Sequence, residues 1–139
     1  MPYPDDCVKG IKDPQYVVGG RAATAAFHFD RKEREDGWKE QSINWVDDPS
    51  VINFTLNDKR TDGMLRYKGG VTILPRLEID KIKSFHSLLD VMDYERNPLK
   101  ENPFHGNILL KTSTLHHVEM QIAASLALAS RPVQQIPEE

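Results

Sequence analysis

The feature that most constrains this fold is a long amphipathic segment near the C-terminus, residues 112–130, with the sequence TSTLHHVEMQIAASLALAS. Its apolar side chains recur at intervals of three or four residues, which predicts a helix with one apolar face; they are Leu115, Val118, Ile122, Leu126 and Ala129. The alanines beside this stripe allow another element to approach closely. Because the apolar face must be covered, the remainder of the chain has to supply a second layer.

Strand patterns occur on both sides of the chain's centre. In the second half of residues 16–29, alternate side chains would fall on opposite faces of a strand. Residues 38–46, which follow the charged segment 30–37, show the same alternation. We therefore expect these two segments to form an antiparallel hairpin. Residues 107–111, with the sequence NILLK, predict a buried strand.

The central part of the chain mixes helix and strand signals. Asp48 and Pro49 are suited to the start of a short helix, and Asp80 to the cap of a second one, whose apolar residues are Ile82, Phe85 and Leu89. Residues 64–74 read as a strand interrupted at Gly69 and Gly70. Residues 93–106 contain two prolines and are expected to form an ordered loop.

These elements predict an α+β fold: a mostly antiparallel sheet of about four strands with two or three helices packed on it. A barrel-like sheet with peripheral helices is the alternative. A chain of 139 residues has the usual length of one domain, so we expect a single domain over 1–139 with loose termini at about 1–12 and 131–139.

Composition narrows the class of protein. A net charge of −3 and a pI near 5.9 argue against a nucleic-acid partner. The single cysteine, Cys7, has no partner for an intramolecular disulfide, and no apolar run is long enough to cross a bilayer. Neither a secretory signal nor a membrane partner is indicated, so we expect a cytoplasmic, soluble protein.

Two adjacent histidines at the predicted start of the last helix suggest chemistry. With Thr114 as the cap, His116 and Glu119 share a face at a spacing used by helical metal sites, whereas His117 points elsewhere. The zincin order His-Glu-x-x-His is absent, and Met120 breaks the inverted order. The sequence therefore assigns no metal and no cofactor. The simpler interpretation is that these are solvent-facing polar residues at the start of a helix.

A second possible ligand pair is His28 and Asp30. Alternate strand residues share a face, and a His-x-Asp pair supplies two ligands of a 2-His-1-carboxylate iron site, with His86, His105 or His116 as a third. The structural alternative is that His28 ends a strand and Asp30 begins a turn.

Residues 102–107, NPFHGN, resemble part of the His-Pro-Phe-x-x-Gly-Asn-Gly-Arg signature of Fic nucleotidyl transferases. Asn102 replaces the catalytic histidine, the spacing is one residue shorter, and the phosphate-binding Gly-Arg is missing, so the resemblance does not imply that activity. It leaves His105 and Asn107 as residues expected at the mouth of a cleft.

Two hypotheses about function follow. The first is a small non-catalytic protein-binding or regulatory module, adaptor-like or inhibitor-like, with a protein partner or a second copy of the chain; its expected binding residues are Trp38, Arg96, Asn107 and His117. The second is a small enzyme, possibly metal-dependent, whose catalytic residues are His105, His116 and Glu119 at the start of the C-terminal helix. Whether the protein is an enzyme stays open on sequence alone.

Overall fold

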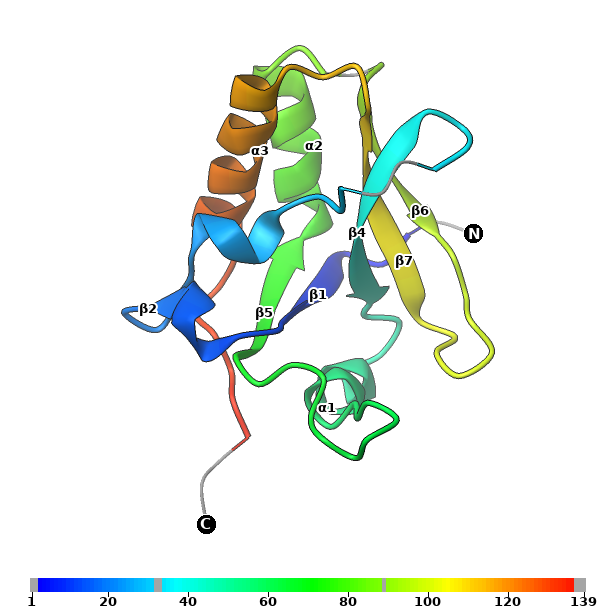
Figure 1. Cartoon of the computed structure of the whole chain (residues 1–139), viewed down its shortest axis with the longest axis vertical. Helices are drawn as coiled ribbons and strands as arrows, with labels where there is room; N and C mark the ends of the chain where they lie inside the picture. The colour runs from blue at the N-terminus through cyan, green and yellow to red at the C-terminus, as the bar shows by residue number, and fades with distance from the viewer. Residues whose placement is uncertain (1–2, 32–33, 89, 137–139) are drawn as a thin grey trace.

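The computed structural model describes residues 3–31, 34–88 and 90–136, and within them the chain has the α+β fold that was predicted. Its main sheet has five strands in the order β5-β1-β4-β7-β6, with every neighbouring pair antiparallel. These strands are β1 (Asp6–Ile11), β4 (Trp38–Trp45), β5 (Gly70–Pro75), β6 (Met92–Arg96) and β7 (His105–Lys111) (Figure 1). A separate two-stranded ribbon joins β2 (Val17–Val18) and β3 (Arg21–Ala22).

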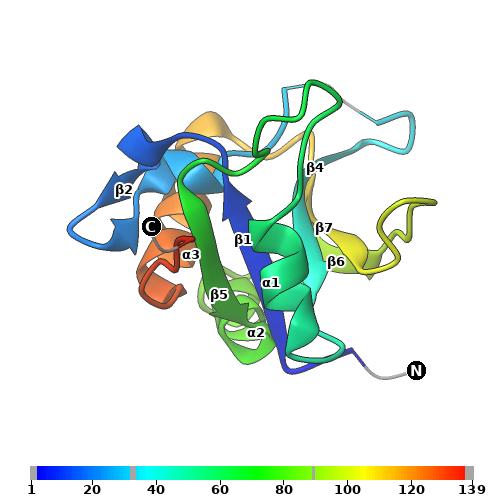
Figure 2. The ribbon, with the colours of Figure 1, turned by 90° about the horizontal axis from the view of Figure 1, so that it is seen from below.

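Helices cover both faces of the main sheet. α2 (Arg76–Phe85) and α3 (His116–Ala129) lie side by side on one face, and α1 (Ser50–Leu56) lies on the other (Figures 1 and 2). Within β1, Cys7 is buried in the cluster that contains the α2 and α3 side chains, whereas Val8 is buried with Val51 and Leu56 of α1. Successive strand residues point to opposite faces, so the sheet separates a large core from a small one.

The single cysteine belongs to the large core. Cys7 is fully buried, and this burial raises the pKa of its thiol to about 12. The thiol is therefore protonated at neutral pH and acts as a small apolar side chain rather than as a nucleophile.

The predicted strand in residues 22–29 is wrong. Of these residues only Ala22 belongs to a strand, β3, and the chain then forms a 3-10 helix, η2 (Thr24–Phe27), which buries Phe27 beneath α3. Gln41 of β4 holds this segment by donating to the Phe27 carbonyl at 2.9 Å. The run of alanines explains the difference, because alanine has little preference for strands and its alternation carries little information.

Parts of the two segments expected to be loose, 1–12 and 131–139, pair with the main sheet. Residues 6–11, which fell within the expected loose terminus 1–12, form β1 in the interior of the sheet. At the other end, Arg131 donates its backbone N–H to Ile73, and Gln134 pairs with Val71, so residues 131–134 follow the outer edge of β5. Both segments depend on partners distant in sequence, which local patterns do not reveal.

Three further boundaries differ from the predictions. β6 occupies the first part of the expected loop 93–106, because a charged strand at a sheet edge carries no apolar alternation. α2 begins at Arg76 rather than at Asp80. α3 begins at His116 after an uncapped Leu115, and the Thr114 hydroxyl has no hydrogen-bond partner among the described residues.

Within the described ranges, no helix has the length and apolar character needed to cross a membrane.

Candidate functional site

The candidate site lies where two central strands separate. β1 pairs with β4 at two positions only, ending at Val8 and Asn44, but it continues to pair with β5 as far as Ile11. Past the last β1–β4 pair, the ammonium of Lys9 donates to the backbone carbonyl of Ser42 on β4 at 3.0 Å. A side chain thus satisfies a strand carbonyl at the point where backbone pairing has ended.

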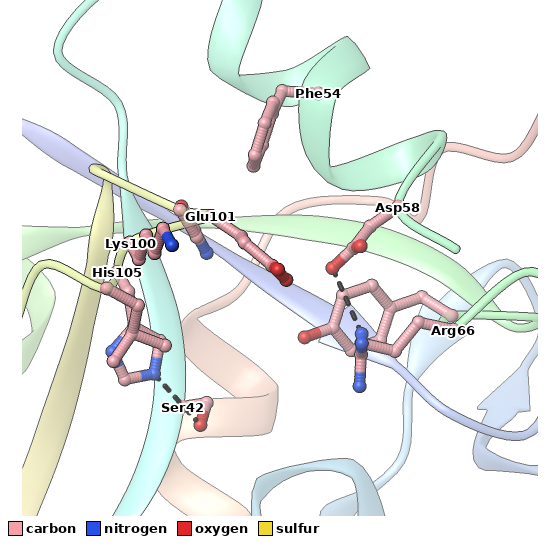
Figure 3. Close-up of a pocket in the computed structure, with 10 residues that line it drawn as sticks. Ser42, Phe54, Asp58, Arg66, Lys100, Glu101 and His105 are labelled. Atoms are coloured by element: carbon pink, nitrogen blue, oxygen red, sulfur yellow. Dashed lines mark hydrogen bonds and ion pairs between the residues drawn. The ribbon is translucent and has the colours of Figure 1, made fainter. Parts of the chain in front are cut away.

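Two adjoining pockets open beside this separation, and Ser42, Arg66 and Tyr67 line both of them. The first has a volume of about 390 Å³ and lies on the α1 face; we call it the His105 pocket. Besides the shared residues, it is lined by Phe54, Asp58, Leu99, Lys100, Glu101, Asn102 and His105 (Figure 3). Its charged side chains are two cations and two carboxylates, so its charge is balanced.

His105 and Ser42 form the most chemically suggestive contact in this pocket. β4 and β7 place them on the same face, where His105 Nε2 lies 3.3 Å from the Ser42 hydroxyl (Figure 3). The other ring nitrogen, Nδ1, lies 2.9 Å from the Asn97 carbonyl, which can only accept. A neutral ring therefore carries its proton on Nδ1, and Nε2 accepts from Ser42, which is the orientation of a nucleophile and its base.

The remaining polar groups of the His105 pocket are largely engaged with one another. Asn102 donates to the Asn44 amide oxygen at 2.8 Å and accepts the Phe104 backbone N–H at 3.1 Å. Arg66 pairs with Asp58 at 3.1 Å. These contacts hold the polar side chains of the pocket in place around Ser42 and His105.

The second pocket has a different character. It has a volume of about 400 Å³ and we call it the Lys9 pocket; besides the shared residues, its lining includes Lys9, Lys12, Tyr16, His28, Phe29, Asp30 and Arg31. Among the described residues that line it, Lys9, Lys12 and Arg31 lie with one carboxylate, Asp30, and Arg66 also lines it while paired with Asp58. This local positive charge stands out in a chain whose net charge is −3.

Lys9 is the buried cation of that pocket. Only 9% of its surface is exposed, and desolvation lowers the pKa of its ammonium from 10.5 to about 8, with Asp30 partly opposing the change. The ammonium has three N–H donors, of which one bonds to the Ser42 carbonyl. Lys12, Arg31 and Arg66 are exposed around it.

The structure does not bring the three predicted catalytic residues together. His105 begins β7 and His116 follows its far end, and a seven-residue strand spans about 20 Å. Glu119 forms an ion pair with Lys39 on the α2–α3 face, whereas His105 lies on the α1 face. His116 and His117 are exposed at the start of α3.

The other predicted binding residues are dispersed as well. Trp38 is half-buried with the Lys111 ammonium 4.6 Å from its ring centroid, and Arg96 makes a bidentate ion pair with Asp47. Asn107 is fully buried and donates to Glu95 at 2.8 Å. None of these side chains lines either pocket.

Metal ligands are not assembled in the described part of the chain, where no group of three or more His, Cys, Asp and Glu side chains is placed to hold an ion. His28 and Asp30 both line the Lys9 pocket, but His105 lies in the other pocket and His86 contacts Ser125 of α3. Comparisons with protein-family models, with curated proteins and with solved structures find no match to this chain.

Sequence reasoning found His105 but missed Lys9, Ser42, Arg66 and Tyr67. One signal was present: Lys9 falls between Cys7 and Ile11 at the strand spacing of two, so the buried face of β1 carries a lysine. A cation at a core-facing position is rare unless it is paired or functional.

Proposed function

We propose that this protein is a non-catalytic protein-binding module whose binding surface is the His105 pocket. The observation that carries the proposal is the apolar rim of an otherwise polar pocket: Phe54 is 36% exposed and Leu99 is 49% exposed. Apolar anchors surrounded by polar groups are typical of protein interfaces.

The rim is held in place before any partner binds. The Phe54 ring packs against Phe104 with centroids 5.3 Å apart, in an edge-to-face arrangement. Leu99 is fixed by two backbone hydrogen bonds with Asn102, whose side chain is anchored to Asn44 of β4. A surface that is already ordered loses little conformational entropy on binding, which favours affinity.

Charged residues beside the rim supply a basis for specificity. Lys100 and Glu101 occupy the turn between Leu99 and Asn102, and neither forms an ion pair with another described residue. Figure 3 shows the Glu101 carboxylate directed across the pocket toward Asp58 and Arg66. Rim charges of this kind select partners and steer their approach more than they add affinity.

A photoreactive amino acid at position 99 tests the proposal in a native lysate. We expect it to cross-link one defined protein, and we expect the Phe54→Ser substitution to abolish that product. The matched control places the same group at position 85, because Phe85 is 84% exposed but lies on α2, across the sheet. Equal products at both positions, or products that survive Phe54→Ser, would contradict the proposal. If the cross-linked protein is a second copy of this chain, the surface joins the two copies in a homo-oligomer.

The cytoplasm is the location that we propose, and one structural feature supports it. The only cysteine is buried as a free thiol, which suits a reducing compartment.

A second candidate function rests on the contact between Ser42 and His105. In a hydrolase, His105 Nε2 would take the proton of Ser42 as its oxygen attacks the carbonyl carbon of an ester. The ring would then give that proton to the alcohol that leaves as the ester bond breaks, and water would release the acyl group from Ser42. The Asn97 carbonyl would orient the ring. A fluorophosphonate probe separates the candidates, because it labels activated serines. Labelling that disappears in both Ser42→Ala and His105→Gln would establish the enzyme, whereas an unlabelled protein leaves the binding module.

A further inference from the structure

The Lys9 pocket has features of a ligand site that the protein-binding proposal does not use. It adjoins the His105 pocket, yet its own cations, Lys9, Lys12 and Arg31, lie outside that pocket. We propose that the Lys9 pocket binds a small molecule carrying a phosphate monoester.

Charge is the first support. The cations come from different segments: Lys9 from β1, Lys12 from the turn after it, Arg31 from the segment before β4, and Arg66 from the loop before β5. Such segments meet at one place only through folding. Among the described residues that line the pocket Asp30 is the one carboxylate, and Asp58 outside it pairs with Arg66, so Lys9, Lys12 and Arg31 are the cations left to an anion. Because a phosphate monoester carries nearly two negative charges and three acceptor oxygens at neutral pH, it matches several cations better than a carboxylate does.

The burial of Lys9 is the second support. Removing an ammonium from water is unfavourable unless its charge is compensated, and no carboxylate of the described chain lies within ion-pair distance of it. With one of three donors used on the Ser42 carbonyl, two remain for a ligand. An anion in the pocket would supply the missing compensation.

The third support is the size and aromatic lining of the pocket. A volume of about 400 Å³ lies in the range of small-molecule sites and exceeds the needs of a lone phosphate ion. Tyr16, Phe29 and Tyr67 line it, and the Tyr67 ring lies against Gly10, where any larger residue would collide with it. These rings offer apolar contacts to the organic part of the ligand.

The test is an NMR titration of the full chain at pH 7 and constant ionic strength, with inorganic phosphate, phenyl phosphate and benzoate as probes. We expect saturable shifts of the Lys9, Gly10 and Ser42 backbone amides, with phenyl phosphate at least tenfold tighter than inorganic phosphate and benzoate the weakest. The Lys9→Met substitution should weaken phenyl phosphate binding at least tenfold.

A matched pair of double variants keeps the result decisive even if Lys9→Met fails to fold. K12A/R31A removes two exposed cations of the pocket, and K59A/K81A removes the same charge from outside it. We expect the first to weaken binding and the second to leave it unchanged. Equal effects of the two pairs, shifts spread over all surface cations, or benzoate binding as tight as phenyl phosphate would overturn the proposal.

Discussion

The His105 pocket and the Lys9 pocket share Ser42, Arg66 and Tyr67, yet among the described residues that line them the one buried charged side chain is Lys9, in the second pocket. In the His105 pocket, amides, a histidine and an Arg–Asp pair satisfy one another and hold an apolar rim in place. In the Lys9 pocket, a desolvated ammonium faces other cations and a single carboxylate. Satisfied polar groups add stability and order, whereas unsatisfied ones retain interaction energy for a ligand.

The largest expected effect comes from breaking the network under the His105 pocket. Asn44 is 5% exposed, donates to Thr55 at 2.8 Å and accepts from Asn102. Asn44→Ala should lower the free energy of unfolding by about 2–3 kcal/mol, because one buried and one partly buried hydrogen bond are lost and the Asn102 donor is left unpaired. Urea unfolding measures this, and a loss below about 0.5 kcal/mol would mean that the network does not hold the rim.

The shared wall offers a way to disturb both pockets at once. Gly10→Ala places a methyl group against the Tyr67 ring, which must move. We expect a loss of about 2 kcal/mol in unfolding free energy, the usual cost of overpacking. Phenyl phosphate binding and cross-linking from position 99 should both weaken. If only one of these two measurements changes, Tyr67 does not shape both pockets.

Lys9→Met should raise the free energy of unfolding, whereas the two preceding substitutions should lower it. Lowering the pKa of Lys9 from 10.5 to about 8 corresponds to about 3 kcal/mol of destabilisation while the amine is charged. The lost bond to the Ser42 carbonyl offsets about 1 kcal/mol, so at pH 7 we expect a net gain of about 2 kcal/mol in the free energy of unfolding.

The pH dependence of that gain provides its control. Below pH 8 the folded and unfolded chains both hold the Lys9 proton, so the cost is fully present; between about pH 8 and 10.5 the folded chain releases it first, and wild-type stability rises. The Cys7 pKa of about 12 keeps the thiol neutral over this range. The advantage of Lys9→Met should therefore shrink toward pH 10.5. A constant difference would show that packing, and not desolvation of the ammonium, separates the two proteins.

The smallest effect is expected at the residue between the pockets. Ser42 is exposed, and its hydroxyl bonds only to His105 at 3.3 Å, while Lys9 uses its backbone carbonyl. Ser42→Ala should therefore change the free energy of unfolding by no more than about 0.5 kcal/mol. Thermal unfolding suffices to measure it, and a loss above about 1.5 kcal/mol would assign the hydroxyl a larger part in joining the pockets.

The sequence predicted the elements that have a clear local pattern, and it missed those that depend on contacts between residues distant in sequence. The stripe from Leu115 to Ala129 and the alternation in residues 38–46 are local patterns, and they correctly predicted α3 and β4. β1 was missed because Lys9 and Gly10 interrupt its apolar pattern, although the sheet places it between β5 and β4. Local pattern also predicted the wrong neighbour for β4, a hairpin with residues 16–29, because its partners β1 and β7 are distant in sequence.

The candidate site was harder still to predict. His105 was identified from its surroundings in the sequence, but its partners Ser42 and Asn97 come from β4 and from the turn after β6. The Lys9 pocket combines four segments between residues 9 and 67, and no short motif encodes such a combination. The paired histidines at 116 and 117 were prominent in the sequence, yet the fold places them at an exposed helix start.

The central claim is that the Lys9 pocket, unlike the His105 pocket, holds a buried charge. Its most direct measurement is the titration of the Lys9 side chain by NMR in free protein and with phenyl phosphate. We expect a pKa of about 8 for Lys9 in the free protein, and a higher pKa when the phosphate binds, because the anion favours the charged amine. A pKa near the ordinary 10.5 that phenyl phosphate leaves unchanged would contradict this claim.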